Sequence, residues 1–414
     1  MAENIGRVRL DMLPLLNDVL GLNLAETEYT RGMSSEIRAE NIRFLIRQML
    51  QQEANTKLII MVIDDAQWMD SASWLLLESL IRDLTNTLFI VLTQPFVDKN
   101  PASLNKIIEL SGTRKIVLSA MAKRDIAALV CQQLKVDLLP DSILNLILER
   151  AEGHPLYSEV LANDLAERKI LIIEDGVCAL AAGITNAQGI ELPSSMESAI
   201  VSRLERLSLD QQLALKTASV IGRQFSMQEL HYLYPIENDR ESLNLELDAL
   251  CIMGMTQPQV RHVEYFFKHL ATQRIAYGLM LYSQRKKMHR QAAQWIELNS
   301  NNISNKYPDL ALHWRRAEEP VKAIKYLGLA AEQAHELFAN RETLDYLDQI
   351  ETLSADNQIS IEHLKRVRWK GMSGAARLAL GRLNESEQDF RAALALLGID
   401  LPNSKAGFLL RAVG

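Results

Sequence analysis

This chain has little cysteine, no long apolar run and no excess of basic residues. Its three cysteines, Cys131, Cys178 and Cys251, lie far apart in 414 residues, and none forms a C-x-x-C pair. That spacing excludes a cysteine metal cluster and a disulfide framework, and it favours a reducing, cytoplasmic setting. No apolar run approaches the ~20 residues of a membrane span, and the N-terminus lacks the apolar core of a signal peptide. We therefore expect a soluble protein.

The net charge of the chain is mildly negative. Against 52 acidic residues stand 45 basic ones, which gives a net charge of −7. Nucleic acids bind basic surfaces, so nucleic acid is not expected to be the main partner. The histidines are scattered, with no spacing typical of a zinc site. With 48% hydrophobic and 23% charged residues, the composition is that of ordinary globular protein, and the length allows several domains.

The first part of the chain predicts an α/β domain. A helical period in residues 39–54 is followed by three short apolar runs, at 58–63, 88–93 and 115–119. Such runs are typical of parallel strands buried on both faces. Between the first two runs lies a helix with Asp70 or Ser71 as its cap. Its apolar stripe consists of Trp74, Leu77, Leu80, Ile81 and Leu84. Trp74 is therefore expected in the core, whereas Trp68 precedes the cap, in a loop.

Beyond residue 120 the pattern becomes mostly helical. "KILIIEDGVCAL" predicts two short strands about an Asp175-Gly176 turn, and "MTQPQVRHVEYFFKH" predicts a second β-hairpin. "RLALGRLNESEQDFRAALALLG" has the small-residue pattern of a tetratricopeptide unit, with Gly381 at a close helix approach and Phe390 and Ala393 downstream. The expected fold class is α/β followed by mostly α.

Two adjacent acids, Asp64 and Asp65, follow the first apolar run in "LIIMVIDDAQWMDSASW". Ligands of open α/β sheets bind at the carboxyl ends of the strands. In phosphate-handling ATPases an acid there holds the Mg²⁺ of the nucleotide, and a second acid polarises the attacking water. The pair therefore predicts an ATP–Mg²⁺ site, although carboxylates that merely bracket the following loop would give the same pattern.

The phosphate-binding partner of such acids is missing. A loop of the form G-x-x-x-x-G-K should precede the acid-pair strand and cradle the phosphates with its backbone N–H groups. The glycines there are Gly6, Gly21 and Gly32, and none begins that pattern. We expect this polypeptide alone to bind ATP weakly or not at all, and we expect either a lost P-loop or a longer protein that supplies one upstream.

Five segments in order resemble the STAND-type AAA ATPases. "VIDDAQWMDSASWLLLESL" resembles their Walker B region, "EGHPLYSEVLANDL" the G-x-P segment of the helical lid, and "LPSSMESAIVSRLERL" the start of the winged-helix domain. "YFFKHLATQRIAYGLMLYSQ" is similar to that domain's end, and "LALHWRRAEEPVKAIKYLGLAAEQA" to the first part of the repeat region. Within this group the chain is similar to the region that follows the cyclase domains in soluble class III adenylyl cyclases. The cyclase domains are absent from this sequence, so cyclase activity is not expected of it.

The resemblance implies four parts: a partial nucleotide-binding domain of the P-loop NTPase type over residues 1–122, a helical lid with a hairpin over 123–185, a winged-helix-like domain over 186–300 and TPR-like helices over 301–414. It also implies roles for single residues. Asp64 would hold Mg²⁺ and Asp65 would polarise water. Thr93 would contact the nucleotide, next to a position that is often Arg in the family and is Gln94 here.

Three further residues have an implied role and a plainer alternative. Gly153 and Pro155 would pack the lid near the adenine, but Gly and Pro also simply end helices. His269, in "FFKH", would meet the diphosphate of ADP, but a His after aromatic residues is also common in a core. These alternatives stay open from the sequence.

We thus expect a nucleotide-switch region of a soluble adenylyl cyclase-like signalling protein. ATP and Mg²⁺ would be its cofactors if a P-loop is supplied, and other proteins would bind its helical repeats. One alternative is a non-catalytic interaction scaffold with a degenerate ATPase fold. Another is a transcription activator of the same ATPase group. Such a protein would need a DNA-binding helix-turn-helix near its C-terminus, whereas the C-terminal part of this sequence has the pattern of helical repeats.

Overall fold

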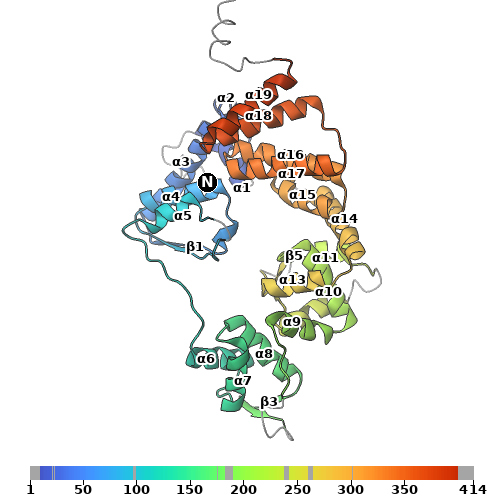
Figure 1. The fold of residues 1–414 in the computed structure, drawn as a ribbon. Helices are drawn as coiled ribbons and strands as arrows, with labels where there is room; N and C mark the ends of the chain where they lie inside the picture. The colour runs from blue at the N-terminus through green and yellow to red at the C-terminus, as the bar shows by residue number, and fades with distance from the viewer. Residues whose placement is uncertain are drawn as a thin grey trace, which may run out of the picture. The chain divides into compact units, whose positions relative to one another are not determined.

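The computed structural model describes residues 10–399, except residues 21, 23, 97–98, 175, 182–189, 237–241, 260–263 and 301. The chain forms two compact units, one of residues 1–115 with 296–414 and one of residues 116–295 (Figure 1). The first unit is therefore discontinuous in sequence. Of the helices that the structure describes, none is long and apolar enough to cross a membrane.

The first part of the first unit consists of helices and a small parallel sheet. Its elements up to residue 108 are η2 (Leu10–Leu16), α1 (Asn17–Leu20), α2 (Glu28–Arg31), α3 (Ser35–Ala54), β1 (Ile59–Ile63), η3 (Ala66–Trp68), α4 (Ser71–Asp83), β2 (Thr87–Val91) and α5 (Ala102–Ile108). Strand β1 pairs with β2 in parallel, from Ile59 opposite Thr87 to Ile63 opposite Val91. The predicted order of strand, helix and parallel strand is confirmed.

Helix α4 follows from local chemistry. The Asp70 carboxylate accepts a hydrogen bond from the Ser73 N–H at 2.6 Å, so Asp70 is the cap. The predicted stripe faces the core, where Trp74 and Leu77 pack with Leu104 and Ile107 of α5. One face of the sheet joins the same cluster through Ile63, Phe89 and Val91.

The prediction that these strands are buried on both faces is wrong for the described residues. Alternate side chains of both strands are exposed, by 41 to 69%: Leu58, Ile60, Val62, Leu88, Ile90 and Leu92. The third predicted strand, 115–119, is also wrong, because these residues form no strand and Ile116, Val117 and Leu118 are 70 to 87% exposed. A strand needs a neighbour to pair with and a layer to pack on, and no described element provides either here.

The remainder of the first unit is a series of antiparallel helices. They are η7 (Ile303–Lys306), α15 (Tyr307–Arg316), α16 (Pro320–Glu336), α17 (Asn340–Asp356), α18 (His363–Ala379) and α19 (Leu383–Leu396). Each helix from α15 to α18 packs on the next one in sequence, as Figure 1 shows. In addition, α16 contacts α3, and α17 contacts α4. The predicted helical repeat region is thus present as stacked helices.

The prediction that Gly381 lies at a close approach of two helices is wrong. Gly381 has a φ of +76°, and a Cβ added there would meet no atom within 4 Å, so it serves a turn. Helices come close at Gly328 and Gly374 instead. There a Cβ would lie 2.5 Å from the Trp369 ring and 2.9 Å from the Phe390 ring, respectively. The period of small residues was informative, but which of them faces a neighbour depends on the packing.

The second unit is helical with two small antiparallel sheets. Its elements are α6 (Lys123–Leu134), α7 (Asp141–Ala151), α8 (Pro155–Glu167), β3 (Leu171–Glu174), β4 (Val177–Leu180), α9 (Met196–Glu205), α10 (Leu209–Ile221), β5 (Gln224–Ser226), α11 (Met227–Leu233), α12 (Leu243–Ile252), β6 (Thr256–Pro258), β7 (Glu264–Phe267), α13 (Leu270–Gly278) and α14 (Tyr282–Asn299), within which the unit boundary falls.

Both predicted hairpins are confirmed. Strand β3 pairs with β4, and β6 pairs with β7, each antiparallel. Asp175 of the first turn lies outside the described residues. Strand β5 was not predicted; it has three residues, adds to β7 and makes the order β5-β7-β6.

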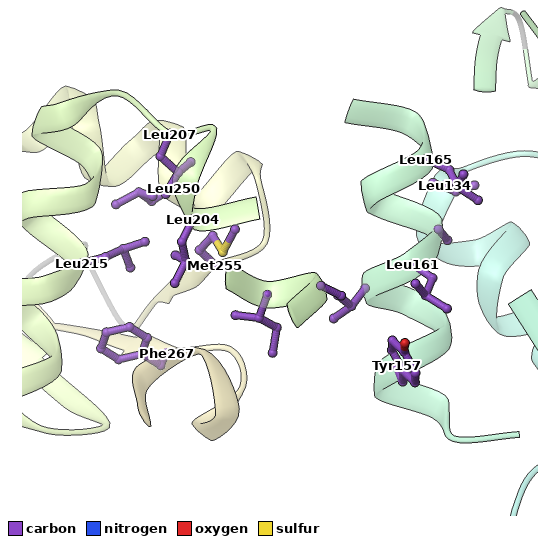
Figure 2. Packing of buried hydrophobic residues seen from close by; sticks show 14 of the residues in the cluster. Leu134, Tyr157, Leu161, Leu165, Leu204, Leu207, Leu215, Leu250, Met255 and Phe267 are labelled. Carbon is purple, nitrogen blue, oxygen red and sulfur yellow. The ribbon is translucent and has the colours of Figure 1, made fainter. Parts of the chain in front are cut away.

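One hydrophobic cluster extends through this unit from α6 to α13. Leucines of α8 and of α9, α10 and α12 contribute to it, as Figure 2 shows with Leu161, Leu204, Leu215 and Leu250. Ion pairs flank the contact of α8 with α9, where Arg206 lies 2.7 Å from the buried Asp164. The two helices are thus held by apolar packing and by paired charges.

Candidate functional site

The acid pair lies at the carboxyl end of β1, at the sheet edge where β2 also ends. Because the strands are parallel and in register, the Leu92 N–H donates to the Ile63 carbonyl at 2.8 Å, and the Ala66 N–H donates to the Leu92 carbonyl at 2.9 Å. Asp64, Asp65 and Thr93 therefore meet at one edge, as the sequence suggested. This is the edge of an open parallel sheet where ligands bind.

A short network shapes the acid-pair loop. Asp65 has a left-handed backbone with φ of 52°, a conformation that costs about 1 kcal/mol for a residue with a Cβ. Its carboxylate accepts a hydrogen bond from the Gln67 side-chain amide at 3.0 Å. The Gln67 side-chain oxygen accepts one from the Gln94 N–H at 3.1 Å. Gln67, which sequence reasoning did not single out, therefore ties Asp65 to the end of β2.

The two acids differ in their surroundings. Asp64 is exposed, and its carboxylate accepts a hydrogen bond from the Asp65 N–H at 2.9 Å. Asp65 is half-buried. At the end of β2, the Thr93 hydroxyl donates to the Gln94 carbonyl at 2.9 Å. The edge therefore carries one carboxylate open to solvent and one fixed by its neighbours.

The donor set of this edge fits Mg²⁺ as part of a larger complex. Mg²⁺ prefers oxygen ligands and is usually held by one or two carboxylates, several waters and substrate phosphates. Across the residues that the structure describes, no group of three or more His, Cys, Asp or Glu side chains could hold a metal ion by itself. Asp64 and Asp65 thus suit a Mg²⁺ ion whose other ligands come from water and nucleotide.

The two tryptophans beside the acids occupy different environments, as predicted. Trp74 is 2% exposed and makes an edge contact with Phe96, at 6.4 Å between ring centroids. Trp68, in η3 directly after the acids, is 70% exposed. Trp74 belongs to the core, and Trp68 lies open at the sheet edge.

Gly153 and Pro155, in the second unit, have a clear structural role. Gly153 has a φ of +78°, and a Cβ there would lie 2.7 Å from the Met121 carbonyl oxygen. The Met121 N–H donates to the Gly153 carbonyl at 2.9 Å. Pro155 then begins α8, whose first turn is capped by His154, with Nδ1 accepting from the Tyr157 N–H at 3.3 Å. Only Gly fits this close approach.

His269 follows β7 and lies against α8. Its Nε2 is 3.7 Å from the Glu159 carboxylate, and its side chain is 27% exposed. Burial, with Lys268 and Arg203 nearby, lowers the pKa of His269 to about 4. The imidazole is therefore neutral at pH 7. The second unit thus brings His269 to the helix that Pro155 begins, whereas the acid pair and Thr93 belong to the first unit.

Glu342, on α17, is a further residue that the sequence did not reveal. Its carboxylate accepts hydrogen bonds from the N–H and the hydroxyl of Ser71, at 2.9 and 2.6 Å. Ser71 begins α4, directly after the acid-pair loop. The partners are 271 positions apart, so no local pattern could have predicted the contact.

Sequence comparison supports the proposed relationship. The chain is 26% identical to adenylate cyclase type 10 of Oryctolagus cuniculus in an alignment 262 positions long, which covers 54% of this chain and 16% of the rabbit protein. The same protein of Homo sapiens is 24% identical over 262 residues. This chain is related to a segment of adenylate cyclase type 10. It spans only about a sixth of the length of these relatives.

Other similarities cover different shares of the chain. An uncharacterized protein of Rhizobium meliloti is 22% identical over 320 residues, 75% of this chain and 29% of that protein. Residues 123–179 match a family described as a domain of unknown function, DUF8739. A solved structure of a STAND protein with a tetratricopeptide repeat sensor, from Pyrococcus horikoshii, aligns with a TM-score of 0.47 and 12% identity, over 87% of this chain and 52% of that one.

Proposed function

We propose that this chain is a regulatory, nucleotide-switch region of a soluble adenylyl cyclase-like signalling protein in the cyclic AMP pathway. The observation that carries the proposal is the similarity over 262 residues to adenylate cyclase type 10. The carboxylate pair at the end of a parallel strand supports the nucleotide part of it. Because the chain spans 16% of the rabbit relative, the proposed role is one within a longer assembly and does not include cyclic AMP formation by this chain itself.

The two acids would have different roles at the sheet edge where the nucleotide would bind. Asp64, exposed at the strand end, would hold the Mg²⁺, which when bound with ATP neutralises phosphate charge. Asp65, oriented by Gln67, would accept a hydrogen bond from a water and polarise it. Thr93 at the end of β2 would face the same nucleotide. The phosphate cradle would have to come from a P-loop that this sequence lacks.

The other parts would respond to the nucleotide. In this proposal α6 to α8 with β3 and β4 form the lid, α9 to α13 with β5 to β7 a winged-helix-like domain, and α15 to α19 TPR-like repeats that bind proteins. The three-stranded antiparallel sheet that follows α9 and α10 supports the second assignment. The Gly153–Pro155 turn would lie near the adenine. His269, neutral at pH 7, would act toward a diphosphate as a hydrogen-bond donor.

A second candidate is a non-catalytic interaction scaffold. The stacked helices α15 to α19 favour it, since such stacks present extended surfaces to other proteins. In that case Asp64 and Asp65 would only shape the loop.

A chimera discriminates between the two candidates. This chain would replace the aligned segment of rabbit adenylate cyclase type 10, so that the rest of that protein is supplied. Nucleotide binding, nucleotide hydrolysis and cyclic AMP formation would be measured. We expect Asp64→Asn to weaken Mg²⁺-dependent nucleotide binding and Asp65→Asn to slow hydrolysis while sparing binding. Asp70→Asn is the matched control, because Asn caps a helix as well as Asp does.

The results with these variants distinguish the nucleotide switch from the scaffold. If a folded chimera binds and hydrolyses nucleotide equally in all four forms, the acids are structural and the scaffold candidate is favoured. If Asp70→Asn is as harmful as the other two changes, the loss reflects the loop's fold and contradicts the assigned roles.

A further inference from the structure

A single carboxylate connects the acid-pair loop with the helical repeats of the first unit. Glu342 Oε1 accepts from the Ser71 N–H at 2.9 Å, and Oε2 accepts from the Ser71 Oγ–H at 2.6 Å. Both residues are half-buried. Ser71 is the first residue of α4, and Glu342 lies in the first turn of α17. The N-terminal ends of two helices therefore meet at one carboxylate.

Helix electrostatics favour this arrangement. The N–H groups of a first helical turn have no partner within the helix, and the N-terminus carries a partial positive charge. Glu342 is acidic in the first turn of α17, whose cap position, Ala339, makes no side-chain cap hydrogen bond. The same carboxylate satisfies the first N–H of α4. A charged acceptor makes stronger hydrogen bonds than a neutral one, so Glu342 holds the start of α4 firmly.

The surroundings show that the contact is embedded in the unit. Burial raises the pKa of the Tyr346 phenol, one turn along α17 from Glu342, and the negative charges of Glu342, Asp345 and Asp70 add to that increase. The charges of α17 and of the α4 cap thus act on the same side chain. The acid-pair loop and the repeat helix share one local environment.

The loop between the acids and Ser71 is short and has hydrogen bonds of its own. The Met69 N–H donates to the Ala66 carbonyl at 3.1 Å, and the Trp68 N–H donates to the Asp65 carbonyl at 3.0 Å. The Gln67 side chain donates to the Asp65 carboxylate. Residues 65–69 thus form a short hydrogen-bonded turn, and Asp70 joins this turn covalently to Ser71. A displacement of the first turn of α4 would therefore be transmitted to Asp65 through a short stretch of backbone.

We propose that Glu342 is a positioning residue for the acid pair, and that its hydrogen bonds to Ser71 couple the loop of residues 64–70 to the first turn of α17. The coupling deepens the proposed function, because it gives Mg²⁺-bound nucleotide at the loop a route to the repeats. Coupling is reciprocal. A protein that binds at the start of α17 would in turn alter the position of Asp65.

Hydrogen exchange of the chain without nucleotide tests the coupling, since backbone protection reports local opening. We expect Glu342→Ala to accelerate exchange of residues 66–74 by about tenfold or more, within the range of typical couplings. Ser71→Ala should accelerate exchange of residues 341–346.

The matched control is Glu351→Ala on the same helix. The Glu351 side chain is 59% exposed, and its carboxylate pairs with Lys370 at 2.6 Å. This control should leave the exchange rates of residues 66–74 unchanged. Glu342→Gln, which keeps the volume and one acceptor oxygen, should give a smaller acceleration at the same residues and serves if Glu342→Ala does not fold.

Two results would overturn the proposal. Unchanged exchange of residues 66–74 in both Glu342 variants would mean that the acid-pair loop keeps its position without this contact. Equal acceleration across the whole unit, including α18 and α19, would mean that Glu342 only contributes to overall stability. Because no nucleotide is present, failure of the proposed nucleotide function would not produce either result.

Discussion

Trp68 and Trp74 are six residues apart, and truncating the two side chains should affect stability to very different degrees. Trp74 is 2% exposed in a core cluster, whereas Trp68 is 70% exposed. Removing a buried Trp side chain typically costs ~3–5 kcal/mol, a large share of the ~5–15 kcal/mol that stabilises a domain. Trp74→Ala should therefore sharply lower the melting temperature or make the chain insoluble, and Trp68→Ala should change it little. Thermal melts of the two variants test this prediction. Equal, large losses of melting temperature would show that the loop with Trp68 is packed as core.

Gly153 should not tolerate a side chain, because its φ is +78° and the Met121 carbonyl would lie 2.7 Å from a Cβ. We expect Gly153→Ala to destabilise the chain by more than ~1 kcal/mol in urea denaturation. Gly278→Ala is the control, since nothing lies within 4 Å of a Cβ there. It should be neutral or slightly stabilising. If the two variants unfold at the same urea concentration, the turn adapts and the structural role assigned to Gly153 is wrong.

His313 should make stability depend on pH. Burial lowers its pKa in the folded chain to about 4 from an ordinary value of 6.5. The unfolded chain therefore binds more protons between these values, so the stabilising contribution is fully present above pH 6.5 and is lost as the pH falls toward 4. The shift corresponds to at most ~3 kcal/mol.

Replacing His313 should reduce this acid sensitivity. His313→Gln should lose less melting temperature than the unchanged chain between pH 7 and pH 4.5, whereas His363→Gln, an exposed residue on α18, should not differ from it. The same acid-induced loss in all three chains would contradict the assignment to His313.

At the scale of elements, strand β1 should show one sensitive face and one tolerant face. Ile63 packs with the cluster of α4 and α5, while Ile60 is 59% exposed. We expect Ile63→Ala to cost about 2 kcal/mol and Ile60→Ala about 0.5 kcal/mol or less. Urea titrations of the two variants compare the same substitution in one strand. Equal costs would mean that the outer face is covered in solution.

Helices and hairpins were the elements that local sequence predicted well. The stripe from Trp74 to Leu84, the Asp70 cap and both hairpins rest on side-chain period, capping and turn chemistry, which act over a few residues. Strand β5, of three residues, was missed because a strand that short has no period to detect. Residues 115–119 look like a strand by composition, but pairing needs a neighbour that composition does not supply.

For the whole molecule, the missing P-loop leads to a prediction about ATP. Backbone N–H groups and a Lys normally provide most phosphate contacts. Isothermal titration of this chain with Mg-ATP should show weak binding or none. A sub-micromolar dissociation constant would mean that the residues present bind phosphates in a way that the sequence pattern does not reveal.

The sequence by itself determined the order of β1, α4 and β2, the two hairpins, the place of the acid pair after a strand and the division of the two tryptophans between core and loop. All of these depend on local periodicity, caps and the rule that parallel strands end at one edge. Only the tertiary structure decided which face of β1 and β2 is covered, which glycines meet a neighbouring helix, and that residues 1–115 share a unit with residues 296–414. The contact of Glu342 with Ser71 belongs to the same class. Each depends on segments far apart along the chain, whose meeting is set by the packing of whole helices and leaves no local signal.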